Sequence, residues 1–323
     1  MKWSISKCSF AIGGFNPILR EMKSVEVIGN NISFNLPPLP ITLVDHSFVV
    51  TIDNELMIIG GIARYDIDHN KREPMKANLI FRGTKWTNHS VPLQPRRRPI
   101  SISMPNGIYV FGGTDVTTFL SERLESSEFL ANGKMTWEEG PKLPVEAEFM
   151  EGGHGVAISE TEFVIVGGQV ITQMQKDETS GNILCHYYAS NQIWKFNTIT
   201  EEWHLIGNLN EARFNHKVAF LSDTVIVSGG LTCDDSKNKF VVSNSTEIFD
   251  PHTTIVEPLL VGKLNVSRFN HFMGIISKQG IRRLISYGGF NYENCHLDSI
   301  EEWNPDKKEW KLLQQKLSVK RGI

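Results

Sequence analysis

A short apolar run that ends in Gly-Gly occurs six times in this chain, and this repeat constrains the fold more than any other feature. The six pairs are Gly13-Gly14, Gly60-Gly61, Gly112-Gly113, Gly167-Gly168, Gly229-Gly230 and Gly288-Gly289. They follow one another at intervals of 47 to 62 residues, and most are preceded by β-branched or aromatic tetrads that suit buried strands. A repeat of about 50 residues with a strand before Gly-Gly predicts the blades of a β-propeller.

Each repeat carries the signals of four strands. Strand one precedes the Gly-Gly strand by one hairpin, as in 47–52, 156–159, 217–221 and 272–277, and turn residues join the two. After Gly-Gly comes a polar loop, then a third strand that ends in an aromatic residue. A turn such as Asp250-Pro251 follows, and a large apolar residue, usually Trp, opens strand four. The sequence therefore predicts an all-β fold of six blades with four antiparallel strands in each.

The Gly-Gly pairs and the spaced aromatic residues resemble the kelch family of β-propellers over essentially the whole chain. Length alone favours two domains, but the resemblance implies a single propeller domain. Its blades are expected at approximately 1–40, 41–94, 95–146, 147–208, 209–262 and 263–323. The tryptophans that open strand four are expected to fill the wedges between blades. Phe34 and Val256 replace them in repeats one and five, where looser packing is expected.

The two ends of the sequence bear on how the ring closes. Strand one of the first blade would lie within 1–5, ahead of a turn at Ser6-Lys7. At the other end, 317–321 matches 264–268, a segment that precedes a strand one. The sequence thus stops where the ring would return to blade one. Either 1–5 completes that blade, or the chain is a piece of a longer protein.

The predicted topology places two kinds of loop on one face of the ring. The loops between strands two and three share this face with the connections between blades, and we call it the connection face. Rigid scaffolds commonly carry binding residues on such long loops. The longest loop here, 169–190, contains Tyr187 and Tyr188.

The connections carry a second recurrent motif. The run Arg213-Phe214-Asn215-His216 is echoed by Arg268-Phe269-Asn270-His271, with Arg98 and Arg321 in looser register. In kelch proteins that recruit substrates to ubiquitin ligases, an arginine at this place often reaches the pocket rim and pairs with acidic groups of a peptide. The resemblance therefore implies partner-binding roles for Arg213 and Arg268, and less closely for Arg98 and Arg321. The further candidate binding residues are Asn215 and Asn270 of the same motif and Tyr187 and Tyr188 of the long loop. The alternative is that these arginines bond loop carbonyls. One connection instead carries Glu146, Glu148 and Glu151, which predicts a single acidic sector.

Composition excludes several classes of function. Thirty-three Lys and Arg residues against 36 Asp and Glu give a net charge of −3, which argues against a nucleic-acid or membrane-surface binder. No apolar stretch is long enough to span a bilayer. The four cysteines lie far apart without a C-x-x-C pair, as expected for reduced thiols in a cytoplasmic protein.

No catalytic or metal motif stands out. The histidines His46, His154, His216 and His271 begin strand one in four repeats. Imidazoles that converge on a channel could bind zinc, but no Asp, Glu or Cys recurs in step with them, so neither a metal nor another cofactor is expected. Nucleophile-elbow and phosphate-loop motifs do not occur.

The sequence therefore favours a protein-interaction module over an enzyme. Its expected partner is a peptide or protein with acidic groups, bound on the connection face. Substrate recognition for a cullin-type ubiquitin ligase and actin binding are two settings implied by the resemblance. The alternative is a carbohydrate-active enzyme such as a sialic-acid epimerase, for which Glu148 or Glu151 facing Arg213 is the only acid–base pair that the sequence offers.

Overall fold

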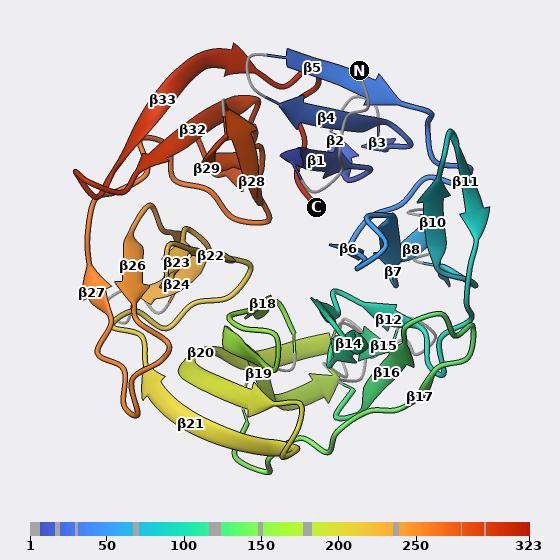
Figure 1. The fold of residues 1–323 in the computed structure, drawn as a ribbon, viewed down its shortest axis with the longest axis horizontal. Coiled ribbons are helices and arrows are strands. Elements are labelled where there is room, and N and C mark those ends of the chain that lie inside the picture. The colour runs from blue at the N-terminus through green and yellow to red at the C-terminus, as the bar shows by residue number, and fades with distance from the viewer. Residues whose placement is uncertain are drawn as a thin grey trace.

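The chain forms a ring of six blades around a central opening, as the computed structural model shows (Figure 1). The structure describes residues 7–16, 20–29, 32–66, 71–115, 124–147, 151–176, 183–234, 239–278, 280–293 and 295–323. The predicted all-β class and the six blades are confirmed. Within the described residues, no helix is both long and apolar enough to cross a membrane.

Blades two to six are four-stranded antiparallel sheets. Blade two consists of β6 (Ser47–Val50), β7 (Leu56–Ile59), β10 (Leu79–Arg82) and β11 (Lys85–Asn88). Blade three consists of β13 (Ile100–Met104), β14 (Gly107–Phe111), β16 (Ser127–Ala131) and β17 (Glu138–Glu139). Blade four consists of β18 (His154–Ala157), β19 (Glu162–Lys176), β20 (Ile183–Asn197) and β21 (Glu202–Asn208).

The last two blades repeat the same strand order. Blade five consists of β22 (Lys217–Leu221), β23 (Thr224–Ser228), β26 (Thr246–Phe249) and β27 (Leu259–Leu260). Blade six consists of β28 (Phe272–Lys278), β29 (Ile281–Tyr287), β32 (Ser299–Asn304) and β33 (Glu309–Lys316).

Blade one is described as three strands that correspond to strands two, three and four of the others. They are β1 (Ser9–Ile12), β4 (Val25–Gly29) and β5 (Ile32–Leu36). The segment 1–5, predicted to supply strand one, lies outside the described residues.

The C-terminal segment runs from blade six to blade one. The Ser318 hydroxyl donates to Glu26 Oε2 at 2.7 Å, and the Phe15 amide donates to the Gly322 carbonyl at 2.9 Å. This segment occupies the connection position that its match to 264–268 predicts. Blade six also packs on blade one through Tyr287, whose hydroxyl donates to the Phe10 carbonyl at 2.9 Å.

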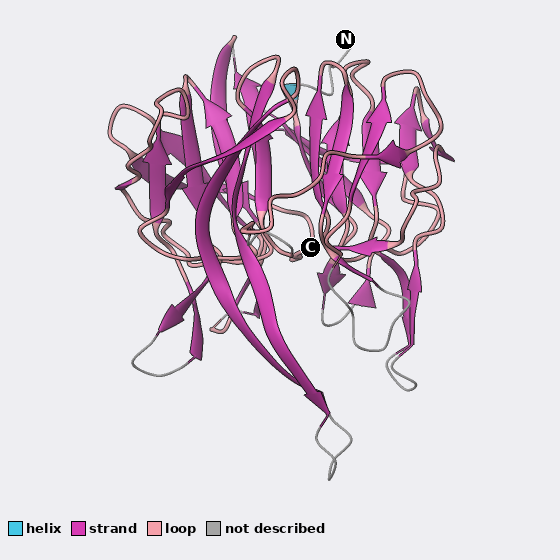
Figure 2. Ribbon diagram, turned by 90° about the horizontal axis from the view of Figure 1, so that it is seen from below, coloured by secondary structure: helices cyan, strands magenta, loops and turns pink. Residues whose placement is uncertain are grey.

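The loops between strands two and three are mostly hairpins rather than irregular loops. Viewed from the side, they project from one face of the ring (Figure 2). The short pairs are β2 (Phe15–Asn16) with β3 (Arg20–Glu21), β8 (Ile62–Asp66) with β9 (Lys71–Pro74), β24 (Leu231–Asp234) with β25 (Lys239–Val242), and β30 (Phe290–Asn291) with β31 (Cys295–His296). In blade three, β15 (Thr114–Asp115) pairs instead with β12 (Arg96–Arg97). In blade four, β19 and β20 stay paired as far as Lys176 and Ile183 and form the longest hairpin.

The Gly-Gly pairs lie where the backbone of the next blade passes closest. The Gly230 amide donates to the Arg268 carbonyl at 2.8 Å. A Cβ on Gly229 would approach that same carbonyl oxygen to 2.5 Å, and Gly229 has a φ of +66°. Glycine is therefore needed both for its backbone conformation and for space. The contact links neighbouring blades, so the glycines are part of the joint between them.

The tryptophans of strand four lie between blades, as predicted. Trp137 Nε1 donates to Ser90 Oγ of the preceding blade at 2.8 Å, and Trp310 Nε1 donates to Thr246 Oγ1 at 2.8 Å. Val256 is also buried at its equivalent position, whereas Phe34 is 38% exposed. Phe34, which replaces the usual Trp in blade one, therefore has its aromatic ring partly in solvent.

Candidate binding sites on the connection face

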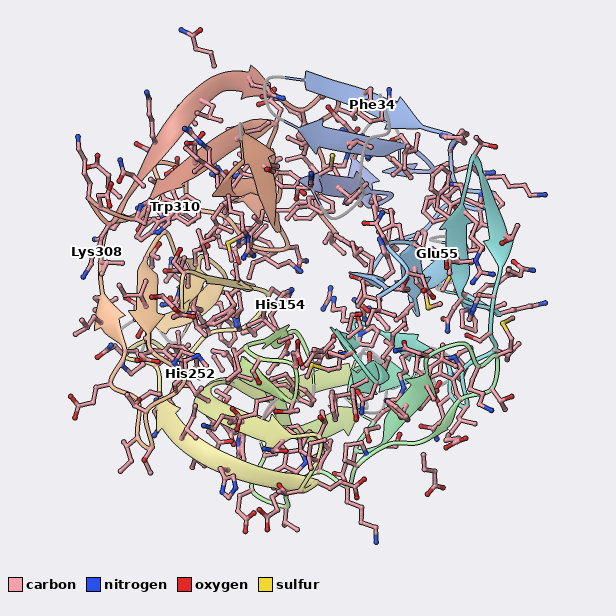
Figure 3. The ribbon with its side chains drawn as sticks, viewed as in Figure 1. Phe34, Glu55, His154, His252, Lys308 and Trp310 are labelled. Atoms are coloured by element: carbon pink, nitrogen blue, oxygen red, sulfur yellow. The ribbon has the colours of Figure 1, made fainter. Side chains whose placement is uncertain are left out.

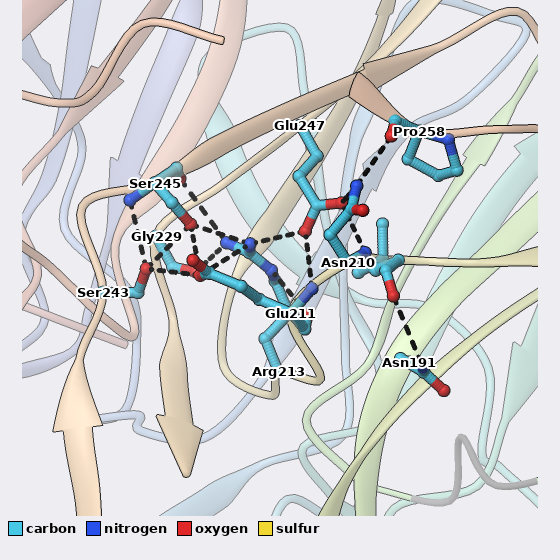
Figure 4. A network of polar contacts seen from close by, with 10 residues as sticks. Asn191, Asn210, Glu211, Arg213, Gly229, Ser243, Ser245, Glu247 and Pro258 are labelled. Carbon is cyan, nitrogen blue, oxygen red and sulfur yellow. Dashed lines mark hydrogen bonds and ion pairs between the residues drawn. The ribbon is translucent and has the colours of Figure 1, made fainter. Parts of the chain in front are cut away.

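Arg213 lies at the centre of a buried polar network (Figure 4). Its guanidinium is fully buried and pairs with Glu247 Oε1 at 2.8 Å, while Nη1 donates to the Gly229 carbonyl at 2.9 Å. Glu247 also accepts from the backbone amides of Asn210 at 2.7 Å and Glu211 at 3.1 Å. Every polar group of this ion pair is thus engaged inside the protein, the condition under which a buried pair is tolerated.

The same network recurs at three other connections. Arg268 pairs with Glu301 at 2.7 Å, Arg96 with Glu128 at 2.8 Å, and Arg321 with Glu26 at 3.8 Å. In each case the arginine comes from a connection and the glutamate from strand three of the blade that follows. All eight side chains are nearly or completely buried.

The structure therefore corrects the expectation that Arg213, Arg268 and Arg321 reach a pocket rim. Each is directed into the blade that follows its connection by a strand-three glutamate that the sequence reasoning overlooked. The sequence does contain a signal for this pairing. A glutamate occupies the same strand-three position in each repeat that has a connection arginine, namely Glu26, Glu128, Glu247 and Glu301. In blade two, the positions of the arginine and the glutamate are occupied by the buried residues Leu43 and Leu79.

The residue two positions after each connection arginine lies at the mouth of the central channel. Arg98, Asn215 and Asn270 all have positive φ, between 47° and 54°. The Asn215 amide donates to the Gly152 carbonyl at 2.6 Å, and the Asn270 amide to the Asn215 carbonyl at 2.9 Å. Backbone hydrogen bonds thus pass from blade to blade around the mouth. Asn and Gly suit this left-handed conformation, so these asparagines have a structural role beside any role in binding.

Arg98 differs from the buried arginines because it remains partly exposed at the channel. Its guanidinium pairs with Asp45 at 2.9 Å and with Glu151 at 3.1 Å, and Arg97 pairs with the other oxygen of Asp45 at 2.6 Å. Burial opposes ionisation of Asp45, but Arg98 and Arg97 outweigh it and hold the pKa of this carboxyl well below its usual range. Glu151 therefore faces Arg98 rather than Arg213, so Glu151 does not form the acid–base pair with Arg213 that was suggested for an epimerase. Glu148 lies outside the described residues.

The channel histidines are not placed as a metal site. Among the described residues, no group of three or more His, Cys, Asp and Glu side chains could hold a metal ion. His46, His216 and His271 directly precede strand one, whereas His154 is the first residue of β18 and so lies one position later in the register. Burial lowers the pKa of each of these four imidazoles, that of His46 to about 4.

These histidines predict acid sensitivity. Below pH 6.5, an unfolded chain protonates its histidines while the buried imidazoles stay neutral, so stability should fall with pH by up to about 1.4 kcal/mol per unit for each histidine. For His46 the loss should end near its folded pKa of about 4. We expect His216→Asn to flatten the dependence of the unfolding midpoint on pH between 6.5 and 5. The matched control is His204→Asn, whose side chain is 59% exposed, and equal slopes for the two variants would contradict the assignment.

A groove of about 960 Å³ lies between blades three and four on the connection face. One wall comes from the root of the long hairpin, at Val170 and Tyr188, and another from the connection 140–147. Tyr188 is 41% exposed and Val145 is 97% exposed. Of the predicted binding residues, only Tyr188 lines this groove, whereas Arg98, Asn215 and Asn270 line the channel. For Tyr187 the structure describes only its backbone pairing with Ile171.

Comparisons with known proteins give distant similarities to kelch-like proteins. The chain is 24% identical over 208 residues to Kelch-like protein 15 of Homo sapiens, which covers 63% of this chain and 32% of that protein. It is 26% identical over 130 residues to Kelch-like protein 25 of Xenopus tropicalis, which covers 38% and 20%. The chain thus spans a third or less of the length of these curated relatives. No protein-family model matches the chain.

The ring also matches a solved structure over almost its full length. The structure of YjhT superimposes with a TM-score of 0.71 and 10% sequence identity, over 97% of this chain and 99% of that one. At this identity the match concerns the fold alone. The six-bladed ring and the similarity to kelch-like proteins together support a kelch-repeat β-propeller family for this chain.

Proposed function

We propose that this chain is a protein-interaction module that binds an extended segment of a partner protein in the groove between blades three and four. The propeller fold and the similarity to kelch-like proteins fit an interaction module in general. The groove is the observation that supports a particular docking place, because its volume of about 960 Å³ is that of a ligand-sized site.

The residues that line the groove indicate which kind of partner segment would bind there. Apolar contacts are offered by Leu93, Val145 and Tyr188, which are 51%, 97% and 41% exposed. Arg96 and Glu128 also line the groove, but they form an ion pair with each other. The other charged side chains of the lining are mainly carboxylates, with Glu125, Glu139 and Glu146 against Lys142. A segment that combines an apolar residue with Lys or Arg is complementary to this surface. This differs from the acidic partner that the arginine motif predicted, since those arginines are neutralised inside the blades.

Two cellular roles are included in this proposal. Substrate recognition in a cullin-type ubiquitin ligase and actin binding both require a partner segment on the connection face. A cytoplasmic location is proposed with them, and the thiols of Cys8 and Cys295 are free among the described residues. A carbohydrate-active enzyme is the competing proposal, and it requires no protein segment in the groove.

Selection of peptides from a random displayed library against the full chain tests the proposal. We expect the enriched peptides to share an apolar residue beside Lys or Arg. A variant with Val145→Glu and Tyr188→Ser should bind these peptides at least about tenfold more weakly, since central apolar anchors typically contribute more than 1 kcal/mol.

The control for this experiment is Ile199→Glu. Ile199 is 74% exposed and lies in the turn between β20 and β21, on the opposite face. The Ile199→Glu variant should therefore bind the selected peptides as tightly as the unmodified chain. Selection of no peptides, of peptides with an acidic consensus, or of peptides that bind the groove variant as tightly as the unmodified chain would overturn the proposal.

A further inference from the structure

A pocket of about 140 Å³ lies between blades five and six on the face opposite the connection face. We call this the turn face, because it carries the turns between strands one and two and between strands three and four. Blade five lines the pocket with Ile226 of β23 and Ile248 of β26, and blade six lines it with Trp303 of β32. Ile226 and Trp303 are buried and Ile248 is partly buried, so the floor of the pocket is apolar.

Aromatic rings occupy the equivalent place between blades three and four. Tyr109 precedes its Gly-Gly pair by three residues, as Ile226 does. Its strand-three partner is Phe129, whereas the strand-three partner of Ile226 is Ile248. The ring centroid of Tyr109 lies 4.6 Å from that of Phe129 and 6.1 Å from that of Phe196, the blade-four counterpart of the tryptophan in the pocket. Blade five thus has two isoleucines where blade three has two aromatic rings, and the smaller side chains leave the space unfilled.

Hydrogen-bond donors surround the opening of the pocket. Ser222 and Thr224, at the turn between β22 and β23, contribute two hydroxyl groups, and Lys308, from the turn between β32 and β33, contributes an ammonium group at the outer margin of the ring (Figure 3). The Thr224 hydroxyl donates to the Ser222 carbonyl at 3.3 Å. The Ser222 hydroxyl and the Lys308 ammonium group make no side-chain hydrogen bond to a described residue. Both can therefore donate to an oxygen acceptor on a ligand.

The charges around the opening favour a neutral ligand. Lys307 pairs with Glu309 at 3.7 Å, which leaves the charge of Lys308. Asp223 and Asp306 stand in the same two turns and are exposed. The opening therefore carries no net positive charge, and a carbonyl group suits it better than a carboxylate does.

We propose that this pocket binds a small neutral molecule with one phenyl-sized ring and a carbonyl acceptor. An apolar cavity of roughly 150 Å³ lined by aliphatic and aromatic side chains takes up benzene, and an aromatic ring would also pack favourably against Trp303. The lining is confined to the ends of two neighbouring blades, so it offers a peptide chain little extended surface among the described residues. No residue that lines the groove between blades three and four lines this pocket, so failure of peptides to bind in the groove leaves this proposal unaffected.

Phenylacetamide is the first probe, titrated into the full chain labelled at tryptophan and followed by NMR at the indole resonances. We expect a saturable shift of the Trp303 signal. The signal of Trp137, which lies between blades two and three, should stay unchanged. Acetamide has the same carbonyl group without the ring and should bind at least about tenfold more weakly, because the buried apolar surface contributes most of the affinity. Phenylacetate should bind no more tightly than phenylacetamide.

A variant that fills the pocket tests its location. Ile248→Phe gives blade five the ring that Phe129 gives blade three. It should bind phenylacetamide at least about tenfold more weakly, with an unfolding midpoint that is unchanged or higher, because filling a cavity commonly stabilises a protein. Ile255→Phe is the matched control, since Ile255 belongs to the same blade, is 74% exposed and does not line the pocket. The control should bind phenylacetamide as the unmodified chain does.

Several results would overturn the proposal. They are the absence of a saturable Trp303 shift, equal affinity for acetamide and phenylacetamide, tighter binding of phenylacetate, and undiminished binding by a folded Ile248→Phe variant. A short capped peptide with one phenylalanine that binds at least about tenfold more tightly than phenylacetamide would also overturn it, because a protein side chain would then be the preferred occupant. If Ile248→Phe does not fold, the Trp303 shift in the unmodified chain and its dependence on the ring of the probe still decide the matter.

Discussion

Glu247→Ala is expected to lower the free energy of unfolding by about 3–5 kcal/mol. The substitution leaves the fully buried guanidinium of Arg213 without its carboxylate partner at 2.8 Å, and removing one member of a buried ion pair leaves an uncompensated charge in the interior. It also removes the acceptor for the backbone amides of Asn210 and Glu211. The midpoint and slope of denaturant unfolding of the full chain would measure the effect.

Blade two suggests the compensating change. There Leu43 and Leu79 occupy the two places of the ion pair and are both buried. Replacing both charged residues by apolar ones, as Arg213→Met with Glu247→Leu, should recover most of the lost stability, because such replacements are often neutral or stabilising. A double variant as unstable as Glu247→Ala, or a single variant within about 1 kcal/mol of the unmodified chain, would contradict the stabilising role assigned to this buried pair.

Gly229→Ala is expected to destabilise the chain by about 3 kcal/mol or more. A Cβ here would lie 2.5 Å from the Arg268 carbonyl oxygen and 2.9 Å from His271 Cε1, at a φ of +66°. The left-handed backbone accounts for about 1–2 kcal/mol of this cost, and displacement of the next blade's connection accounts for the rest. The same unfolding measurement applies.

Gly83→Ala separates these two contributions. Gly83 has nearly the same φ, +62°, but a Cβ there would meet nothing within 4 Å. It should cost only the backbone term, about 1–2 kcal/mol. If both variants lose the same stability, the close approach of the neighbouring blade contributes nothing, and the Gly-Gly pairs serve backbone conformation alone.

The periodic features of the fold could be predicted from the sequence because they repeat. Six Gly-Gly pairs after apolar runs, and the tryptophans of strand four, identified the blades and the wedges between them. The match of 317–321 to 264–268 identified the connection that returns to blade one. Such signals are local, since strand patterning and turn residues act over a few positions. Repetition made these weak signals reliable.

The binding residues could not be predicted in the same way. Whether an arginine at a connection faces solvent or the interior depends on what strand three places opposite it. Arg213 is buried because Glu247 lies 34 positions later in the chain but 2.8 Å away in space, whereas Arg98 stays at the channel with Asp45 and Glu151. Only the tertiary structure determines that pairing.

The sequence by itself therefore determined the repeating architecture of this protein, because strand patterning and turn chemistry are encoded within each repeat. The tertiary structure decided which charges remain available for binding. It showed that four connection arginines are neutralised within the blades and that carboxylates surround the groove. The physical reason is that the net charge of a site is a sum over residues brought together from different blades, and the spacing of residues along one repeat carries no information about that sum.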